Sequence, residues 1–174
     1  MSAIDAIREK LPEAAKDLKL NLQAVLRPEV LTADQTWGIA LASVYFIGNA
    51  ELRDAIVADA TAAGISAEII DDAKASASIM GMNTVFYRFR HLIHKESYNK
   101  IPAKLRMTRM SQPKTDKTTF ELMSMACAAL AGCGMCLQAH EAVLLQHEIT
   151  EQGINDVIRI AAVLQGTTVA LGIQ

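Results

Sequence analysis

The sequence is poor in aromatic residues and in proline, and it carries no marked excess of either charge. Aromatic residues make up 5% of the 174 positions, there are four prolines, and the formal net charge is −2. A nearly neutral chain gives no electrostatic reason to expect binding to nucleic acid or to an anionic membrane. The sequence also lacks low-complexity tracts and is long enough to bury a real core. We therefore expect a single domain over residues 1–174.

Two further absences bear on where the protein works. The N-terminal stretch Met1–Lys10 is charged and lacks the apolar segment of a signal peptide, and no uncharged apolar run is long enough for a clean membrane span. These features predict a cytoplasmic protein with no membrane partner. In that compartment the three cysteines do not make a disulfide framework, so a C-x-x-C pair indicates catalysis or metal binding.

Helix-forming residues fill the segments in which apolar positions recur with helical spacing. Ala, Leu, Met, Ile and Lys dominate there, which predicts an all-α fold. Expected helices cover 4–11, 12–26, 33–47, 51–63, 67 to about 93, 119–131, about 133–146 and 150–164. Their starts are marked by Pro12, the Thr32–Gln35 capping box, Asn49, Ser66, Thr118 or Thr119, and Thr150.

The stretch from Lys95 to Lys117 differs from the rest of the chain. It holds seven Lys or Arg residues against Glu96 and Asp116, together with two prolines. We interpret it as a basic connector between a first half, about 1–95, and a catalytic half, about 118–174. It is either a solvated linker or a docking surface for an acidic partner. It lacks the interleaved aromatics and the helix-turn-helix pattern of a nucleic-acid surface.

A weak internal repeat links the two halves. The segments Ile65–Ile70 and Ile149–Ile154 both open a helix that reaches a glycine about 16 residues later, at Gly81 and Gly166. Such self-similarity predicts two similar helical halves packed around a shared core. The segment Gly81–Arg90, rich in Phe and Tyr, is expected to contribute to core and interface packing.

The reactive part of the sequence lies between Glu121 and His140. Cys133 and Cys136 form a C-x-x-C pair, and His140 follows four residues after the second cysteine. Helical spacing places the two thiols and the imidazole on one face of a helix. Cys133 lies close to a helix N-terminus, which favours the thiolate form of its side chain. His140 can accept the proton of Cys136. A dithiol beside an imidazole indicates thiol redox chemistry or metal binding.

Glu121 requires a turn to reach this group. Twelve residues of unbroken helix would place it about 18 Å from Cys133. Gly132 and Gly134 interrupt the helix instead, and a tight turn there would form an antiparallel helical hairpin. Glu121 is then expected to meet His140 rather than the cysteines. These residues are predicted to form a proton relay in which the Glu121 carboxylate orients the His140 imidazole and the imidazole activates the Cys136 thiol. Cys133 would be the resolving thiol, which forms a disulfide with Cys136.

Other readings of these residues are possible. A metal site would use Cys133, Cys136, His140 and either Glu121 or His147 as the fourth ligand, but no second zinc knuckle is present. Leu137 stands where covalent haem attachment needs a histidine, and no βαβ pattern supports a thioredoxin-like fold. We interpret Cys127, on an apolar stripe, as a thiol of the core. The sequence reveals no partner for His91, His94 or His147.

At these residues the chain resembles the alkylhydroperoxidase D family within the carboxymuconolactone decarboxylase-like superfamily. The resemblance spans nearly the whole chain and includes L-P-E-A-A-K-D-L-K-L-N-L, G-M-N-T-V-F-Y-R, K-L-R-M, F-E-L-M-S and G-C-G-M-C-L-Q-A-H-E. It implies an all-α fold with an internal two-fold repeat, usually assembled as a homotrimer. It also implies an antioxidant thiol peroxidase with no bound cofactor or metal.

The resemblance further implies substrates, partners and roles. The substrates would be alkyl hydroperoxides and hydrogen peroxide. Lipoyl groups on a 2-oxoacid dehydrogenase component, as dihydrolipoamide, would reduce the Cys133–Cys136 disulfide, and a peroxiredoxin-type alkyl hydroperoxide reductase could receive electrons. Cys136 would be the peroxidatic thiol, Cys133 the proton donor and resolving thiol, and His140 with Glu121 the relay.

One residue departs from the family pattern. Members carry a histidine directly before the second cysteine, and this chain has Met135 there. The departure motivates a second hypothesis, a disulfide carrier between a lipoyl protein and a peroxiredoxin with little peroxidase activity of its own. A third hypothesis is a structural zinc or interaction domain without enzymatic activity.

Overall fold

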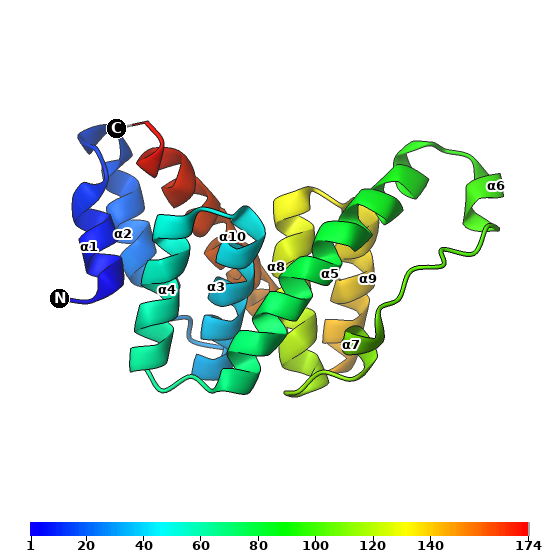
Figure 1. The fold of residues 1–174 in the computed structure, drawn as a ribbon, viewed down its shortest axis with the longest axis horizontal. Helices are drawn as coiled ribbons and strands as arrows, with labels where there is room; N and C mark the ends of the chain where they lie inside the picture. Colours follow the sequence, from blue (N-terminus) through cyan, green and yellow to red (C-terminus); the bar gives the residue numbers. More distant parts are fainter. Residues whose placement is uncertain (174) are drawn as a thin grey trace.

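The computed structural model describes residues 1–173, in which the regular structure is helical and contains no strand (Figure 1). This confirms the predicted all-α class. The helices are α1 (Ala3–Lys10), α2 (Lys16–Val25), α3 (Ala33–Ile47), α4 (Ala50–Ala62), α5 (Ala67–Leu92), α6 (Glu96–Asn99), α7 (Thr108–Ser111), α8 (Lys117–Ala131), α9 (Gly134–Gln146) and α10 (Glu151–Leu171), with a 3₁₀ turn at Glu13–Ala15.

Four of the five predicted side-chain caps are found, whereas the α-helix predicted to start at Pro12 begins at Lys16, after the 3₁₀ turn. Thr32 and Gln35 form the expected capping box, and Asn49, Ser66 and Thr150 each accept a hydrogen bond from the first turn of their helix. The prediction that Thr118 or Thr119 caps α8 is wrong. Asp116 is the cap, and its carboxylate accepts a hydrogen bond from the N–H of Thr119 at 2.8 Å. Aspartate is an even better cap than threonine, and the helix begins at Lys117, two residues before the predicted start.

Helices α3 to α5 and α8 to α10 form two copies of one three-helix unit. Each helix of the second unit starts 84 residues after its counterpart, at positions 33 and 117, 50 and 134, and 67 and 151. The paired helices α3 and α8 both have 15 residues, and α4 and α9 both have 13. This confirms the internal repeat, whose segments Ile65–Ile70 and Ile149–Ile154 share the same offset.

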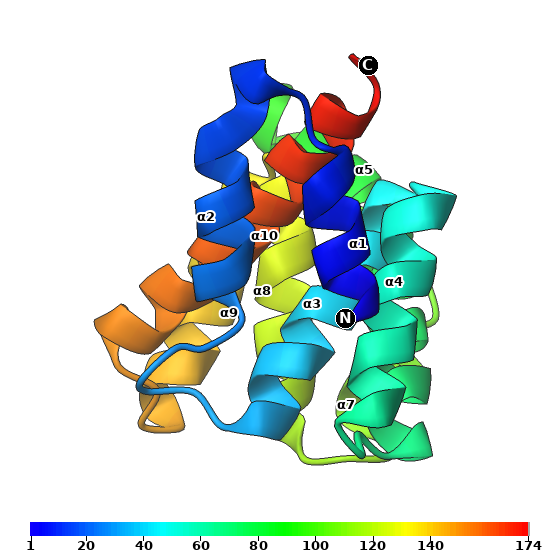
Figure 2. The ribbon, with the colours of Figure 1, turned by 90° about the vertical axis from the view of Figure 1, so that its left-hand side faces the viewer.

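The first helices of the two units form the centre of the molecule. α3 and α8 pack against each other and against α5 and α10, and most of their side chains are buried (Figure 1). The large core residues include Leu41, Phe120 and Met123. α1 and α2 cover one end of this core, where α1 contacts α4 and α2 contacts α10 (Figure 2). The other end carries α9 and the connector.

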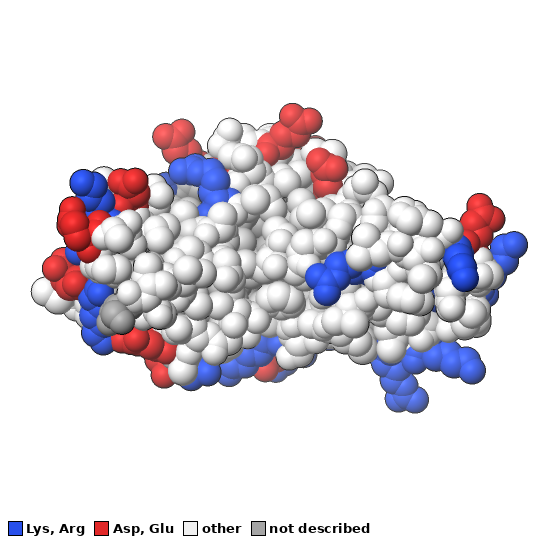
Figure 3. Space-filling view, turned by 90° about the horizontal axis from the view of Figure 1, so that it is seen from above, with Lys and Arg blue, Asp and Glu red and all other residues white. Residues whose placement is uncertain are grey.

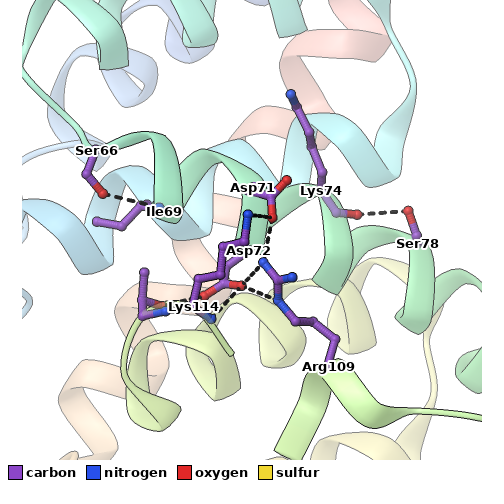
Figure 4. A network of polar contacts seen from close by, with 9 residues as sticks. Ser66, Ile69, Asp71, Asp72, Lys74, Ser78, Arg109 and Lys114 are labelled. Carbon is purple, nitrogen blue, oxygen red and sulfur yellow. Dashed lines mark hydrogen bonds and ion pairs between the residues drawn. The ribbon is translucent and has the colours of Figure 1, made fainter. Parts of the chain in front are cut away.

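The connector leaves the bundle at α6 and returns along α5 through α7 (Figure 1). Asp71 and Asp72 of α5 hold the returning segment (Figure 4). The Arg109 Nε donates to Asp72 Oδ1 at 2.7 Å, and the N–H of Thr115 donates to Asp72 Oδ2 at 2.8 Å. Arg109 and Lys114 also form ion pairs with Asp71. This part of the connector is therefore fixed to the core rather than free in solvent.

The buried carboxyl of Asp72 is stabilised in its charged form. Burial by itself would raise its pKa, but hydrogen bonds from Thr115, from the Lys114 N–H and from Arg109 outweigh that effect. The net result is a pKa below the ordinary value of 3.8. At neutral pH this carboxylate anchors the residues around α7 against α5 and α8.

The last helix, α10, is the one segment among residues 1–173 that is long and apolar enough by composition to cross a membrane. It packs against α8, α3 and α2, and 44% of its most apolar window is buried in the protein. It also contains the ion pair between Asp156 and Arg159. α10 therefore has the features of a core helix.

Candidate active site

The α8–α9 hairpin is formed by a left-handed turn at Gly132. Gly132 has φ 64° and ends α8, and Cys133 is the first residue outside α9. The N–H of Cys133 donates to the carbonyl of Ala128, which closes the turn. Because glycine adopts positive φ without steric cost, this position reverses the chain in two residues. The hairpin predicted from Gly132 and Gly134 is confirmed.

The two cysteines of this turn form a disulfide, so the structure shows the oxidised state. Cys133 and Cys136 are joined with a Cα–Cα distance of 5.3 Å. Cys133 has no exposed surface, whereas Cys136 is 6% exposed and faces a cavity. Of the two sulfurs, Cys136 is the one that a small molecule in this cavity can reach.

A buried carboxylate–imidazole pair lies next to the dithiol. Glu121 Oε2 is 2.6 Å from His140 Nδ1, and each side chain is 8% exposed. The hairpin places the two residues opposite each other, which confirms the contact that the sequence predicts. A carboxylate on Nδ1 fixes the orientation of the ring and leaves Nε2 to exchange protons. His140 lines the same cavity as Cys136, one helical turn away on α9.

The cavity above Cys136 has a volume of about 310 Å³ and mostly apolar walls. Met80 of α5, Met107 and Met110 at α7, and Met135 of α9 supply four of its side chains. Asn83 and Tyr87 of α5 add polar groups. A small apolar molecule with one polar end fits such walls, and Met side chains adapt easily to its shape.

Met135 separates this cavity from a second one with a different character. The second cavity, of about 280 Å³, is lined by Met135 and by Arg90, His91, His94, Lys95, Glu96 and Asn99. Its lining is basic, and His91 and His94 lie with ring centroids 6.2 Å apart. Within residues 1–173, Met135 is the one residue that lines both cavities. Its side chain at this boundary is an apolar thioether.

The third cysteine takes no part in the site. Cys127 of α8 is fully buried, and its thiol donates to the carbonyl of Ala42 at 3.8 Å. Burial raises the pKa of the Cys127 thiol to about 12. The interpretation of Cys127 as a core thiol is confirmed.

The alternative metal site finds no support in this redox state. Both sulfurs of its proposed ligand set are engaged in the disulfide. Within residues 1–173 no group of three or more His, Cys, Asp or Glu side chains is arranged to hold a metal ion.

Two of the residues that the sequence singles out, Cys136 and His140, line the cavity, but its other walls were not predicted. Asn83, Tyr87 and the methionines at 80, 107 and 110 come from α5 and the connector, far from the C-x-x-C pair in sequence. One signal was available. Asn83 interrupts an otherwise apolar stretch of a long helix, and a buried amide in such a place needs a partner.

The chain is similar to known proteins over nearly its whole length. Residues 97–172 match the carboxymuconolactone decarboxylase family. An alkyl hydroperoxide reductase AhpD from Anaeromyxobacter dehalogenans (strain 2CP-C) is 47% identical over 171 residues, which cover 98% of this chain and 91% of the relative. A Brucella suis protein of the same name is 44% identical over 169 residues, or 97% of this chain and 96% of the relative.

Proposed function

Because the chain belongs to the alkyl hydroperoxide reductase AhpD family, and is an oxidoreductase of that type, we propose that it is a thiol peroxidase working through Cys133 and Cys136. Its substrates are alkyl hydroperoxides and hydrogen peroxide. The observation that carries the proposal is the meeting of Cys136 and His140 at one apolar cavity, with Glu121 hydrogen-bonded to His140 behind it.

In the first half-reaction the Cys136 thiolate attacks the terminal oxygen of the hydroperoxide. An S–O bond forms, the O–O bond breaks, and sulfur loses two electrons to give a sulfenic acid. The departing alkoxide takes a proton and leaves as the alcohol. Cys133, adjacent on the same turn, supplies that proton as a thiol. Cys136 and His140 are both held in the packed wall of the cavity, each 6% exposed, so the reacting groups meet in a fixed geometry.

The second half-reaction closes the disulfide that the structure records. The Cys133 thiolate attacks the sulfur of the Cys136 sulfenic acid, the S–O bond breaks, and hydroxide leaves as water after taking a proton. Dihydrolipoamide then restores both thiols. Its first thiolate attacks one sulfur to form a mixed disulfide, and its second thiol displaces the protein to give lipoamide.

Glu121 and His140 supply the proton relay for these steps. His140 removes the proton of Cys136 and becomes an imidazolium, which Glu121 stabilises from the opposite side of the ring. The hydrogen bond of 2.6 Å between them supports this role. The relay works without a bound cofactor or metal.

The proposed reductant is the lipoyl group of a 2-oxoacid dehydrogenase component. Lipoyl-bearing proteins of acidic character would dock on the basic end of the molecule, which α6 and the end of α5 form (Figure 3). The basic cavity beside Met135 opens close to the dithiol and supports this placement. A peroxiredoxin-type alkyl hydroperoxide reductase is the proposed acceptor of electrons from the reduced dithiol.

We also propose a cytoplasmic homotrimer. The C-terminal half of α5 exposes an apolar stripe, because Val85, Phe89 and Leu92 are 63%, 43% and 63% exposed. Large apolar side chains at this spacing form one face of the helix and favour burial between subunits. Size measurement by light scattering tests this assembly.

The test of the function is hydroperoxide consumption by purified protein with dihydrolipoamide as the sole reductant. Wild type is expected to turn over, and Cys136→Ser is expected to lose turnover altogether because the attacking sulfur is gone. Turnover retained in Cys136→Ser would refute the assignment of the peroxidatic thiol.

The second candidate function is a disulfide carrier between a lipoyl protein and a peroxiredoxin. Met135 favours it, since a thioether can neither donate nor accept the proton that a histidine would move there. The same assay separates the two functions. Fast exchange of the Cys133–Cys136 disulfide with dihydrolipoamide, without consumption of hydroperoxide, would establish the carrier and exclude the peroxidase.

A further inference from the structure

Asn83 is a buried amide with an unmet hydrogen-bonding group. It lies on α5, lines the cavity above Cys136 and is 4% exposed. Its Nδ2 donates to the thioether sulfur of Met110 at 3.4 Å. Its Oδ1 is the one buried side-chain nitrogen or oxygen in residues 1–173 that has no hydrogen-bond partner. Native proteins satisfy nearly all such groups, so an unpartnered acceptor at the wall of this cavity is suited to bind a donor group of a ligand.

The other residues that line the cavity indicate what kind of ligand it binds. Cys136 and His140 lie on α9, while Met80, Met107 and Met110 lie on α5 and near α7. The ligand therefore has an apolar body, for the methionines, and a hydrogen-bond donor, for the Asn83 oxygen. It also has an atom that Cys136 can attack. An alkyl hydroperoxide has these three features, because its one O–H group is on the terminal oxygen.

We propose that Asn83 and the methionines at 80, 107 and 110 form the hydroperoxide-binding site, in which Asn83 Oδ1 accepts the hydrogen bond of the terminal O–H. This inference rests on the proposed peroxidase function and adds the residues that hold its substrate. The alkyl group packs against the methionines. The terminal oxygen, held by Asn83, is the oxygen that the Cys136 thiolate attacks.

The hydrogen bond to Asn83 persists through the reaction. Attack forms the S–O bond and breaks the O–O bond, while the terminal oxygen keeps its proton and becomes the hydroxyl of the Cys136 sulfenic acid. The two electrons lost by sulfur reduce the peroxide, and the alkoxide takes its proton from Cys133. Asn83 therefore holds the substrate hydroxyl before the step and the sulfenic hydroxyl after it, which keeps the latter in place until Cys133 attacks.

Met110 controls access to the amide. Asn83 Oδ1 is sealed from solvent, and the Met110 side chain lies against the same amide. Thioether side chains are long and unbranched, so Met110 can swing aside when a ligand enters. Because α7 is held by Arg109 on Asp72, the entry of substrate moves the Met110 side chain rather than the whole connector.

The test compares the two half-reactions in the full-length protein. Reduced protein is mixed rapidly with tert-butyl hydroperoxide or hydrogen peroxide, and the remaining thiol is counted by mass spectrometry after alkylation. Disulfide protein is mixed separately with dihydrolipoamide. Asn83→Leu, similar in shape, is expected to lower the rate of Cys136 oxidation by about tenfold and to leave disulfide reduction unchanged within about twofold.

Stability distinguishes a binding role from a structural one. Since Asn83→Leu removes an unsatisfied buried oxygen, its melting temperature is expected to equal or exceed that of wild type. Thr84→Val is the matched control, because Thr84 is buried next in sequence and bonds only to the Met80 carbonyl on its own helix. That variant is expected to change neither half-reaction.

Each other outcome counts against the proposal. Unchanged oxidation in Asn83→Leu overturns it, and so does an equal fall in both half-reactions or a fall in dihydrolipoamide reduction alone. If Asn83→Leu does not fold, the structural role is favoured, and Asn83→Ala then decides by the same two rates.

For the methionine wall, Met107→Gln is expected to reduce the preference for tert-butyl hydroperoxide over hydrogen peroxide, and an unchanged preference overturns that part. A wild type that fails to react with either peroxide refutes the proposed function itself.

Discussion

The two three-helix units have the same arrangement of helices, but equivalent positions serve packing in the first unit and line a cavity in the second. At the 84-residue offset, Cys136 and His140 of the second unit correspond to Leu52 and Ile56 of the first. Leu52 and Ile56 have no exposed surface and pack in the core, whereas Cys136 and His140 line a cavity. The partner of His140, Glu121, corresponds to the partly buried Trp37.

The turns between the first and second helices of the two units differ in how the second helix is capped. Gly48 and Gly132 end α3 and α8 in the same left-handed conformation. The next residue in the first unit is Asn49, whose side chain accepts a hydrogen bond from Leu52 N at 2.9 Å. Its counterpart Cys133 makes no such bond. The second unit therefore has a cysteine at the position where the first has a capping asparagine. Helix α9 lacks the side-chain cap that stabilises α4.

The largest expected effect comes from removing the relay and making the second unit like the first. His140→Ile should slow Cys136 oxidation by about 100-fold or more, because the general base is lost. It should also destabilise the protein by about 3 kcal/mol, since Glu121 remains buried without its partner. Peroxide kinetics and chemical denaturation measure the two effects.

The double variant Glu121→Leu/His140→Ile sharpens this result. It should regain most of the lost stability, because an apolar pair replaces the buried polar one, while the peroxide reaction stays slow. If the single and double variants are equally unstable, Glu121 and His140 do not depend on each other as the structure indicates.

The second prediction compares two aspartates at the same place in the repeat, Asp72 of α5 and Asp156 of α10. Asp72 accepts bonds from Arg109 and from the N–H and hydroxyl groups of the returning connector, whereas Asp156 bonds Gln152 and Arg159 on its own helix. Asp72→Asn should therefore cost about 2 to 4 kcal/mol, and Asp156→Asn less. Equal losses in urea denaturation would contradict this difference.

The contribution of Asp72 should also depend on pH. Its folded-state pKa lies below 3.8, so the stabilisation is complete above that ordinary value and is lost as the pH falls through the folded pKa. The difference in melting temperature between wild type and Asp72→Asn should accordingly shrink as the pH is lowered from 7 towards about 3. A difference that stays constant over this range would exclude the charged carboxylate as its cause.

The third prediction concerns the caps of α4 and α9, measured in the reduced proteins so that the disulfide does not contribute. Asn49→Ala should cost about 1 kcal/mol, because α4 loses its side-chain cap. Cys133→Ser should stabilise by a similar amount, since a serine hydroxyl can cap α9 as a thiol does not. Calorimetry should show melting temperatures shifted in opposite directions, by about 2 to 4 °C.

The smallest effect is expected at Cys127, whose counterpart in the first unit is Ser43. Ser43 is buried and donates to the carbonyl of Ile39 at 2.7 Å. Cys127→Ser can make the same kind of bond within α8, so both peroxide turnover and stability should change little. Since the pKa of Cys127 is about 12, this thiol should also resist alkylation at pH 8 in native protein. Rapid alkylation of Cys127 would show that the core opens readily.

The features of this structure that could be predicted from the sequence depend on interactions between residues close together in the chain. Capping side chains such as Thr32, Asn49 and Ser66 act within one turn, so their sequence patterns are reliable. The contact between Glu121 and His140 followed from residue counting once the turn at Gly132 was assumed. The capping patterns failed at α8, where Thr118, Thr119 and the adjacent Asp116 could each cap the helix.

The cavity could not be predicted because its walls depend on tertiary packing. Asn83 and Met110 are 27 residues apart, and they meet because Asp72 anchors the connector. No sequence pattern specifies that anchor. The repeat was faint for a related reason. The two units share caps and helix lengths, while their reactive and core positions carry different residues.

The most direct test of the account is to trap the sulfenic acid. Reduced Cys133→Ser and Cys136→Ser proteins are treated with one equivalent of tert-butyl hydroperoxide in the presence of dimedone, and the adducts are located by mass spectrometry. If Cys136 is the peroxidatic thiol, Cys133→Ser gives one adduct per chain on Cys136, and Cys136→Ser gives none on Cys133. An adduct on Cys133 in the absence of one on Cys136 would reverse the roles of the two thiols and contradict the account.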